Sequence, residues 1–155
     1  MFDTAGSVEG DPMSTATLNP APPHVVTSPP GAVRLLAGAR RALGEAAATP
    51  DALERYAFAH LAALRAAAAL LADRARPADA RRRRPTSVWT LLERVAPEMQ
   101  QWAGFFAAGA DKRAAAEAGL RSAVTRREAD DLMRDADAFV ALVETSLGLL
   151  AMRSA

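Results

Sequence analysis

Cysteine is absent from this chain of 155 residues, and aromatic residues make up only 5% of it. Without cysteine, the protein forms no disulfides and offers no thiolate ligands to a metal. No run of about 18 apolar residues occurs, so we expect no membrane-spanning segment. The first residues also lack the basic start and apolar stretch of a secretory signal. We therefore expect a cytoplasmic protein.

The chain also lacks an excess of either sign of charge. The formal net charge is +1, from 19 lysines and arginines against 18 aspartates and glutamates. A nearly neutral protein has no global field that would attract a polyanion. Any contact with nucleic acid must therefore come from local clusters of basic side chains.

Half of the residues are hydrophobic, and most of these are alanine and leucine, which favour helices. No segment has the alternating pattern of a strand. We predict an all-α fold, a compact bundle of about five helices over residues 32–150, with a first helix beginning at Ala32. Residues 1–31 are rich in proline and poor in large apolar side chains, so we predict a disordered tail there.

Local signals place the remaining helices. Residues 49–51, Thr-Pro-Asp, are typical of a helix start, and the second helix should run to about Arg74. Pro97 predicts a kink or a short break in the next helical segment, and Gly109 is a second weak point. Residues 125–128, Thr-Arg-Arg-Glu, predict a capping box at the start of the last helix.

Arg55 and His60, on the second predicted helix, are the best candidates for chemistry. Histidine moves protons near neutral pH, and arginine presents a permanent charge whose fork fits a phosphate. Together the two side chains could cleave a phosphodiester without a metal.

The helical spacing of the pair indicates another role. Five positions at about 100° per residue place the two side chains about 140° apart. His60 then lies on the apolar stripe of its helix, and Arg55 lies nearly opposite, on the polar face. A shared phosphate would need a bend in the helix or an arginine from a second subunit, and the alternative is a packed histidine.

Two further clusters of charged residues have two interpretations each. Four adjacent arginines in a proline-bounded loop could contact phosphates or be solvated; they are Arg81, Arg82, Arg83 and Arg84. Four acidic residues of the last helix could hold a cation, but arginines three or four positions away favour surface ion pairs; the acidic residues are Asp130, Asp131, Asp135 and Asp137. We expect no metal site and no cofactor.

Trp102, Phe105 and Phe106 follow the predicted break at Pro97. Their helical positions point in more than one direction, so one face of a bundle would not bury all three. These side chains are candidates for the core or for the interface of a symmetric homodimer.

Three blocks of the sequence resemble an actinobacterial, SAV-type branch of the HEPN superfamily, named for nucleotide binding in higher eukaryotes and prokaryotes. The resemblance covers about residues 32–148, and its blocks are RYAFAHLAALRAAAALLADRARP, SVWTLLERVAPEMQQWAGFFAAGADKRAAAEAG and TRREADDLMRDADAFVALVETSLG. It implies a compact helical bundle that is often dimeric. Many members are metal-independent ribonucleases that use an arginine and a histidine at a spacing that Arg55 and His60 fit.

The pair departs from that pattern in two respects. It lies on the second helix of the folded region, whereas the superfamily motif usually lies on a late helix. Tyr56 follows the arginine at a position that is often polar in the ribonucleases.

Three hypotheses follow from the residues and the resemblance. The first is a non-catalytic HEPN-like module that binds RNA, a nucleotide or a protein partner such as an antitoxin. The second is a metal-independent endoribonuclease that uses Arg55 and His60, and the third is a helical dimerisation or adaptor protein without a nucleic-acid role. We expect a homodimer that does not associate with membranes.

Overall fold

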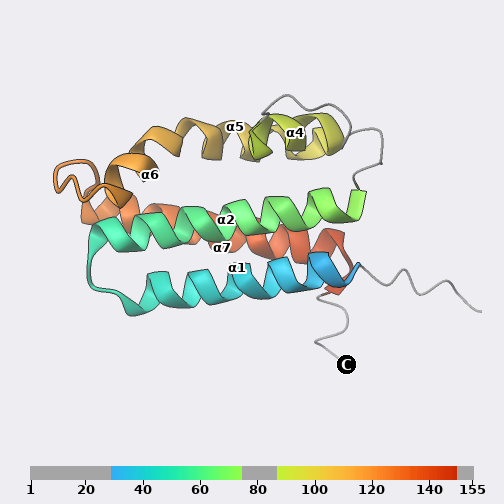
Figure 1. Ribbon diagram of the computed structural model, residues 1–155, viewed down its shortest axis with the longest axis horizontal. Coiled ribbons are helices and arrows are strands. Elements are labelled where there is room, and N and C mark those ends of the chain that lie inside the picture. Colours follow the sequence, from blue (N-terminus) through green and yellow to red (C-terminus); the bar gives the residue numbers. More distant parts are fainter. Residues whose placement is uncertain (1–28, 75–86, 150–155) are drawn as a thin grey trace, which may run out of the picture.

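The computed structural model describes residues 29–74 and 87–149, and within these ranges it is an all-α bundle without strands. This confirms the predicted fold class. Three long helices, α1, α2 and α7, run along the long axis of the molecule, and three shorter ones, α4, α5 and α6, follow one another along one side (Figure 1). The elements are α1 (Pro30–Ala48), α2 (Ala52–Arg74), α4 (Val88–Val95), the 3₁₀-helix η1 (Pro97–Met99), α5 (Gln100–Ala108), α6 (Ala110–Glu117) and α7 (Arg126–Ser146).

Helix α2 is the centre of the bundle, because it packs against α1, α4, α6 and α7. Alanine fills much of its buried surface, and small side chains allow the neighbouring helices to approach closely. Six of these alanines have no exposed surface, and they are Ala59, Ala62, Ala63, Ala66, Ala67 and Ala69.

By length and composition alone, α2 is also apolar enough to cross a membrane. The central helix of a bundle passes the same test, and 56% of the most apolar window of α2 is buried inside the protein. Its apolar character is therefore explained by packing, and the cytoplasmic location stays a prediction.

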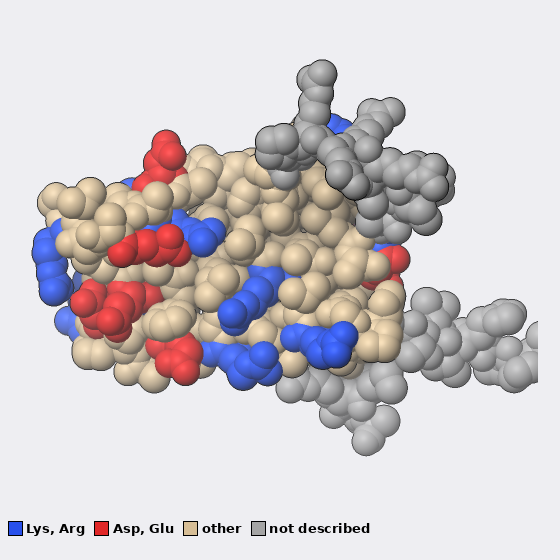
Figure 2. All heavy atoms as spheres, viewed as in Figure 1, with Lys and Arg blue, Asp and Glu red and all other residues tan. Residues whose placement is uncertain are grey.

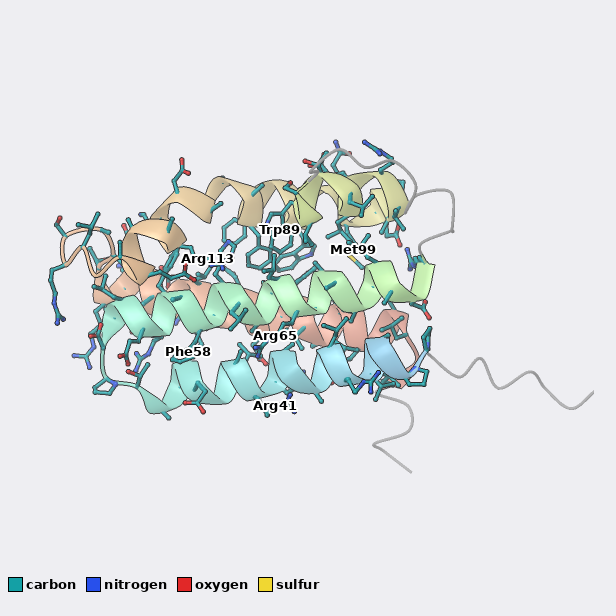
Figure 3. The ribbon with its side chains drawn as sticks, viewed as in Figure 1. Arg41, Phe58, Arg65, Trp89, Met99 and Arg113 are labelled. Atoms are coloured by element: carbon teal, nitrogen blue, oxygen red, sulfur yellow. The ribbon has the colours of Figure 1, made fainter. Side chains whose placement is uncertain are left out.

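An aromatic cluster fills the space between α2, α7 and the shorter helices. Phe106 stacks on Trp89 and on Trp102, with ring centroids 5.2 and 5.9 Å apart, and its centroid lies 5.2 Å from that of Phe139 on α7. Figure 3 shows Trp89 in this region. Few aromatic residues are available in this chain, and four of them are concentrated at one place in the core.

The helix boundaries follow the local signals with one shift. Helix α1 begins at Pro30, before the predicted Ala32. Proline is tolerated in a first turn because the N–H it lacks would have no intrahelical partner there. Pro30 and Gly31, which the sequence assigned to the disordered tail, therefore belong to α1. Residues 1–28 of the predicted tail lie outside the described residues.

The predicted interruptions are present. Pro97 begins the short 3₁₀-helix that separates α4 from α5, and Gly109 separates α5 from α6. Thr125 accepts a hydrogen bond from the Glu128 N–H, and the Glu128 carboxylate accepts one from the Thr125 N–H. The capping box of α7 is therefore confirmed.

Gly109 is also where the α5–α6 junction lies against α2. A Cβ added at Gly109 would lie 2.9 Å from the Tyr56 hydroxyl oxygen, closer than van der Waals contact, and Tyr56 is itself buried. The absence of a side chain at residue 109 allows this close approach.

Replacing Gly109 by alanine should therefore destabilise the protein by about 1–2 kcal/mol. In a Tyr56→Phe background, which lacks the hydroxyl, the same change should be neutral or slightly stabilising, because alanine restricts the unfolded chain more than glycine does. Denaturant unfolding of the four proteins in this double-mutant cycle measures the difference. An equal cost in both backgrounds would exclude the clash as the cause.

Candidate functional site

Arg55 holds three parts of the chain together. Its Nε donates a hydrogen bond to the carbonyl oxygen of Ala46 at 3.0 Å, and its Nη2 donates one to the carbonyl of Thr49 at 2.8 Å. Its Nη1 donates to the carboxylate of Asp130 on α7. The side chain is only 16% exposed. The guanidinium thus satisfies carbonyls at the end of α1 that have no helical partner.

This environment differs from the polar face on which the helical spacing placed Arg55. The difference arises because the turn after α1 and the first turns of α7 both pack against the beginning of α2. Arg55, which would be exposed on an isolated helix, therefore connects α2 to the end of α1 and to α7.

His60 is sealed in the core, with only 1% of its surface exposed. Its Nε2 lies 3.0 Å from the carbonyl oxygen of Phe106, and an N–H at that nitrogen donates to it. Trp89 and Phe106 pack edge-to-face against the imidazole ring, with centroids 5.9 and 6.0 Å away. Its Nδ1 is buried without a hydrogen-bond partner among the residues described.

The protonation of His60 follows from this burial. Desolvation lowers the pKa of the imidazole below its ordinary value of 6.5, and the hydrogen bond to Phe106 only partly opposes the shift. Histidine is therefore neutral in the folded protein at pH 7, and its ring nitrogens are inaccessible to a substrate.

Arg55 and His60 are not brought together. Arg55 faces the α1–α2 turn and α7, whereas His60 faces α4 and α5. In a single subunit, therefore, the two side chains do not surround a common phosphate.

A surface hollow of about 250 Å³ adjoins His60. Tyr56, Phe105, Lys112 and Leu132 contribute to its walls. Burial raises the pKa of the Tyr56 hydroxyl above its ordinary value, and Lys112 Nζ lies 3.0 Å from the Glu128 carboxylate. His60 itself contributes a buried imidazole to this lining, beside the neutral phenol of Tyr56 and the paired ammonium of Lys112.

Trp102, Phe105 and Phe106, the predicted core or interface residues, lie in three different environments. Phe106 is completely buried, Trp102 is partly buried against it, and Phe105 is 47% exposed. Of the three, only Phe105 offers a large free surface to a partner. Arg81, Arg82, Arg83 and Arg84 lie outside the described residues.

Of the four aspartates of the last helix, only Asp131 forms ion pairs at the predicted spacing, with Arg127 and Arg134. Asp130 and Asp137 pair instead with distant arginines, Arg55 and Arg40, and Asp135 forms no salt bridge with the residues that the structure describes. No group of three or more histidines or acidic residues that could hold a metal occurs in the part of the chain that the structure describes.

Sequence inspection missed two surface hollows between α1 and α2, and we call the face that contains both of them the α1/α2 groove. One end is a hollow of about 390 Å³, and the other is a hollow of about 400 Å³. The first is lined by Gly31, Arg34, Leu35, Gly38, Arg41 and Arg65, and the second by Glu45, Ala48, Thr49, Glu54, Ala57 and Phe58. Figure 2 shows basic side chains near the middle of the face that it presents, and both acidic and basic ones toward the left end.

A signal for the groove was present in the sequence. Arg34, Arg41 and Glu45 are separated by seven and four positions, so they recur on one side of a helix. Arg65 comes from the second helix, and only the packing of α2 against α1 brings it beside Gly38.

The contacts of Arg55 generate a test of its role. Arg55→Ala should lower the free energy of unfolding by about 1–3 kcal/mol, because two backbone carbonyls and one carboxylate lose their donor. Arg127→Ala is the matched control, because Arg127 is 91% exposed in its pair with Asp131, and it should cost less than about 0.5 kcal/mol. Equal denaturation midpoints for the two variants would contradict the structural role of Arg55.

Comparison with known proteins agrees with the geometry of the bundle. A family model described as SAV_6107-like HEPN matches residues 46–144, a range that includes α2 to α6 and most of α7. No curated protein and no solved structure matches the chain. Because the family model covers more than half of the residues, the chain belongs to the SAV_6107-like HEPN family.

Proposed function

We propose that this protein is a non-catalytic HEPN module that acts by binding another protein surface. The observation that carries the proposal is the burial of His60. A histidine with 1% exposure, a neutral ring and a hydrogen bond to the Phe106 carbonyl is poorly placed to exchange a proton with a substrate, because a general base must come within hydrogen-bond reach of the proton that it takes.

The surface supports binding of a protein more than binding of a polyanion. Most basic side chains of the described helices pair with carboxylates, including Arg40, Arg74, Lys112 and Arg113. The α1/α2 groove carries both signs of charge. A phosphate backbone favours a continuous basic track, whereas a folded protein can present both signs at fixed positions.

A cleavage assay tests the absence of catalysis. The purified full chain, incubated with single-stranded RNA in the presence and absence of EDTA, should produce no fragments that end in a cyclic phosphate. His60→Ala should instead destabilise the fold by about 1–3 kcal/mol, because it empties a packed position. EDTA-resistant cleavage by the wild-type chain, lost in a His60→Ala protein that remains folded, would overturn the proposal.

The buried imidazole also predicts a pH dependence of stability. The folded pKa of His60 lies below its unfolded value, so the unfolded chain binds more protons as the pH falls below 6.5. The contribution of His60 to stability should be complete above that pH and should decline as the pH falls toward 5. His60→Gln, which cannot titrate, should remove this decline, as measured by urea unfolding at each pH.

Two considerations make this pH window informative. The pKa values of Glu98 and Glu128 are lowered from 4.5, chiefly by hydrogen bonds from Arg74 and Lys112, so their contributions are lost only as the pH falls below about that value. The other histidine of the chain is His24, and His24→Gln is the matched control. If the decline in stability persists in His60→Gln and disappears in His24→Gln, it does not arise from His60.

A further inference from the structure

Three arginines from two helices surround one hollow on the surface of the bundle, which we call the arginine hollow. Arg34 and Arg41 lie on α1 and Arg65 lies on α2, and all three line the hollow of about 390 Å³ at one end of the α1/α2 groove. The other lining residues are Gly31, Leu35 and Gly38. Among the residues that the structure describes, the lining therefore carries three positive charges and no carboxylate.

Gly38 is the point at which two of the guanidinium groups meet. A Cβ added at Gly38 would lie 3.5 Å from Nη2 of Arg41 and 3.7 Å from Nε of Arg65, so both groups lie over the same place on α1. Nη1 of Arg65 donates a hydrogen bond to the Gly38 carbonyl at 3.0 Å, which holds this side chain across α1. Two positive charges held close together repel each other, and a bound anion relieves that repulsion.

Neither helix supplies a counter-charge to these arginines. No aspartate or glutamate occurs in residues 30–44 of α1 or in residues 55–72 of α2. Glu45, one turn after Arg41, forms no salt bridge with any residue that the structure describes. Arg94 and Arg126 also lack a salt bridge with the described residues, but they lie on other helices, α4 and α7. The arginine hollow differs from such positions because arginines of two helices converge there.

The start of α1 adds to the positive potential of the arginine hollow. Gly31 lies in the first turn of α1 and lines the hollow, and the N-terminal end of a helix carries a partial positive charge. This end of α1 has no acidic residue in its first turn and no side-chain cap. The helix end and the three guanidinium groups together favour an anion that carries more than one charge.

We propose that the arginine hollow binds a phosphorylated side chain of a partner protein, a proposal that rests on the protein-binding function above. A phosphoryl group on a side chain carries about −1.5 to −2 charges at pH 7 and presents three acceptor oxygens. A carboxylate carries one charge and is satisfied by the fork of a single arginine. Three guanidinium groups therefore match a phosphoryl group better than a carboxylate, and arginine clusters are a recurring means of binding phosphorylated segments.

The surroundings of the hollow favour a protein over a nucleic acid. The phosphates of a nucleic acid are diesters with one charge each, and their chain continues beyond any one site. At the other end of the α1/α2 groove, Glu45 and Glu54 line the second hollow, where like charges repel such a chain. A protein segment presents one phosphoryl group to the arginines and neutral or basic side chains to the glutamates. Leu35 offers apolar surface to the residues beside the phosphoryl group.

A titration of the full chain, followed by the amide NMR signals of Gly31 and Gly38, tests the site. The probe is a short acetylated and amidated peptide with phosphoserine at its centre and alanine on both sides. We expect saturable shifts with a Kd of about 1 mM. The matched peptide with aspartate at its centre should bind at least roughly fivefold more weakly, and the peptide with serine should cause no shift. Inorganic phosphate, which has no flanking residues to contact Leu35, should also bind more weakly.

Variants of the arginine hollow locate the binding. Arg41→Ala and Arg65→Ala should each weaken binding of the phosphoserine peptide at least roughly tenfold, and Arg65→Lys should weaken it roughly threefold, because lysine keeps the charge but loses the planar fork. Gly38→Ala should weaken it as well, because the added Cβ lies where the two guanidinium groups meet. Arg41 is exposed, so Arg41→Ala tests the site even if Arg65→Ala does not fold. Arg126→Ala is the matched control, because Arg126 is exposed at the start of α7, and it should bind as the wild type does.

Several outcomes would overturn the site. They include no shift of the Gly31 and Gly38 signals at peptide concentrations well above the expected Kd, and unchanged binding by Arg41→Ala and Arg65→Ala. Equal binding of the aspartate and phosphoserine peptides would exclude the phosphoryl group as the ligand. Inorganic phosphate that binds as tightly as the phosphoserine peptide would exclude the protein partner in favour of a free anion. A single-stranded oligonucleotide that binds the same residues more tightly would exclude it in favour of a nucleic acid.

The failure of this site is distinguishable from the failure of the proposed function. A chain that leaves RNA intact and does not bind the phosphoserine peptide would exclude the site and leave the non-catalytic module standing. Cleavage of RNA by a chain that binds the peptide through Arg41 and Arg65 would exclude the non-catalytic function and leave the site standing.

Discussion

The burial of α2 is the constraint on which the rest of the structure depends. A helix surrounded by α1, α4, α6 and α7 must be apolar on nearly every side, and alanine meets this need while keeping the neighbouring helices close. A small residue buries little area by itself, so the bundle gains stability from many contacts of this kind. The aromatic cluster around Phe106 fills the space where the shorter helices leave a wider gap.

The position of α2 also decides what its two candidate catalytic residues do. The imidazole of His60 is directed toward α4 and α5 and is held there by the Phe106 carbonyl, whereas Arg55 is directed toward α1 and α7. Each side chain stabilises a junction between helices. The spacing that resembles a ribonuclease motif is therefore used in this subunit for packing and for capping.

Several arginines form ion pairs that join one helix of the bundle to another. Arg40 joins α1 to α7 through Glu144 and Asp137, and hydrogen bonding to Glu144 raises the pKa of the guanidinium. Arg55 and Arg74 likewise join helices to each other. The charged side chains of the α1/α2 groove differ, because they form no salt bridge with the residues that the structure describes.

The sequence by itself determined the helices, because their signals are local. Thr125 and Glu128 close a capping box within one turn, Pro97 lacks the N–H that a continuous helix needs, and the apolar stripe correctly placed His60 in the core. Only the tertiary structure decided the environment of Arg55 and the composition of the α1/α2 groove. Arg55 binds groups that are distant in the chain, such as Asp130, and Arg65 reaches the groove only across Gly38. Periodicity reports which side of a helix is apolar, but the contacts of a polar side chain depend on which helices pack beside it.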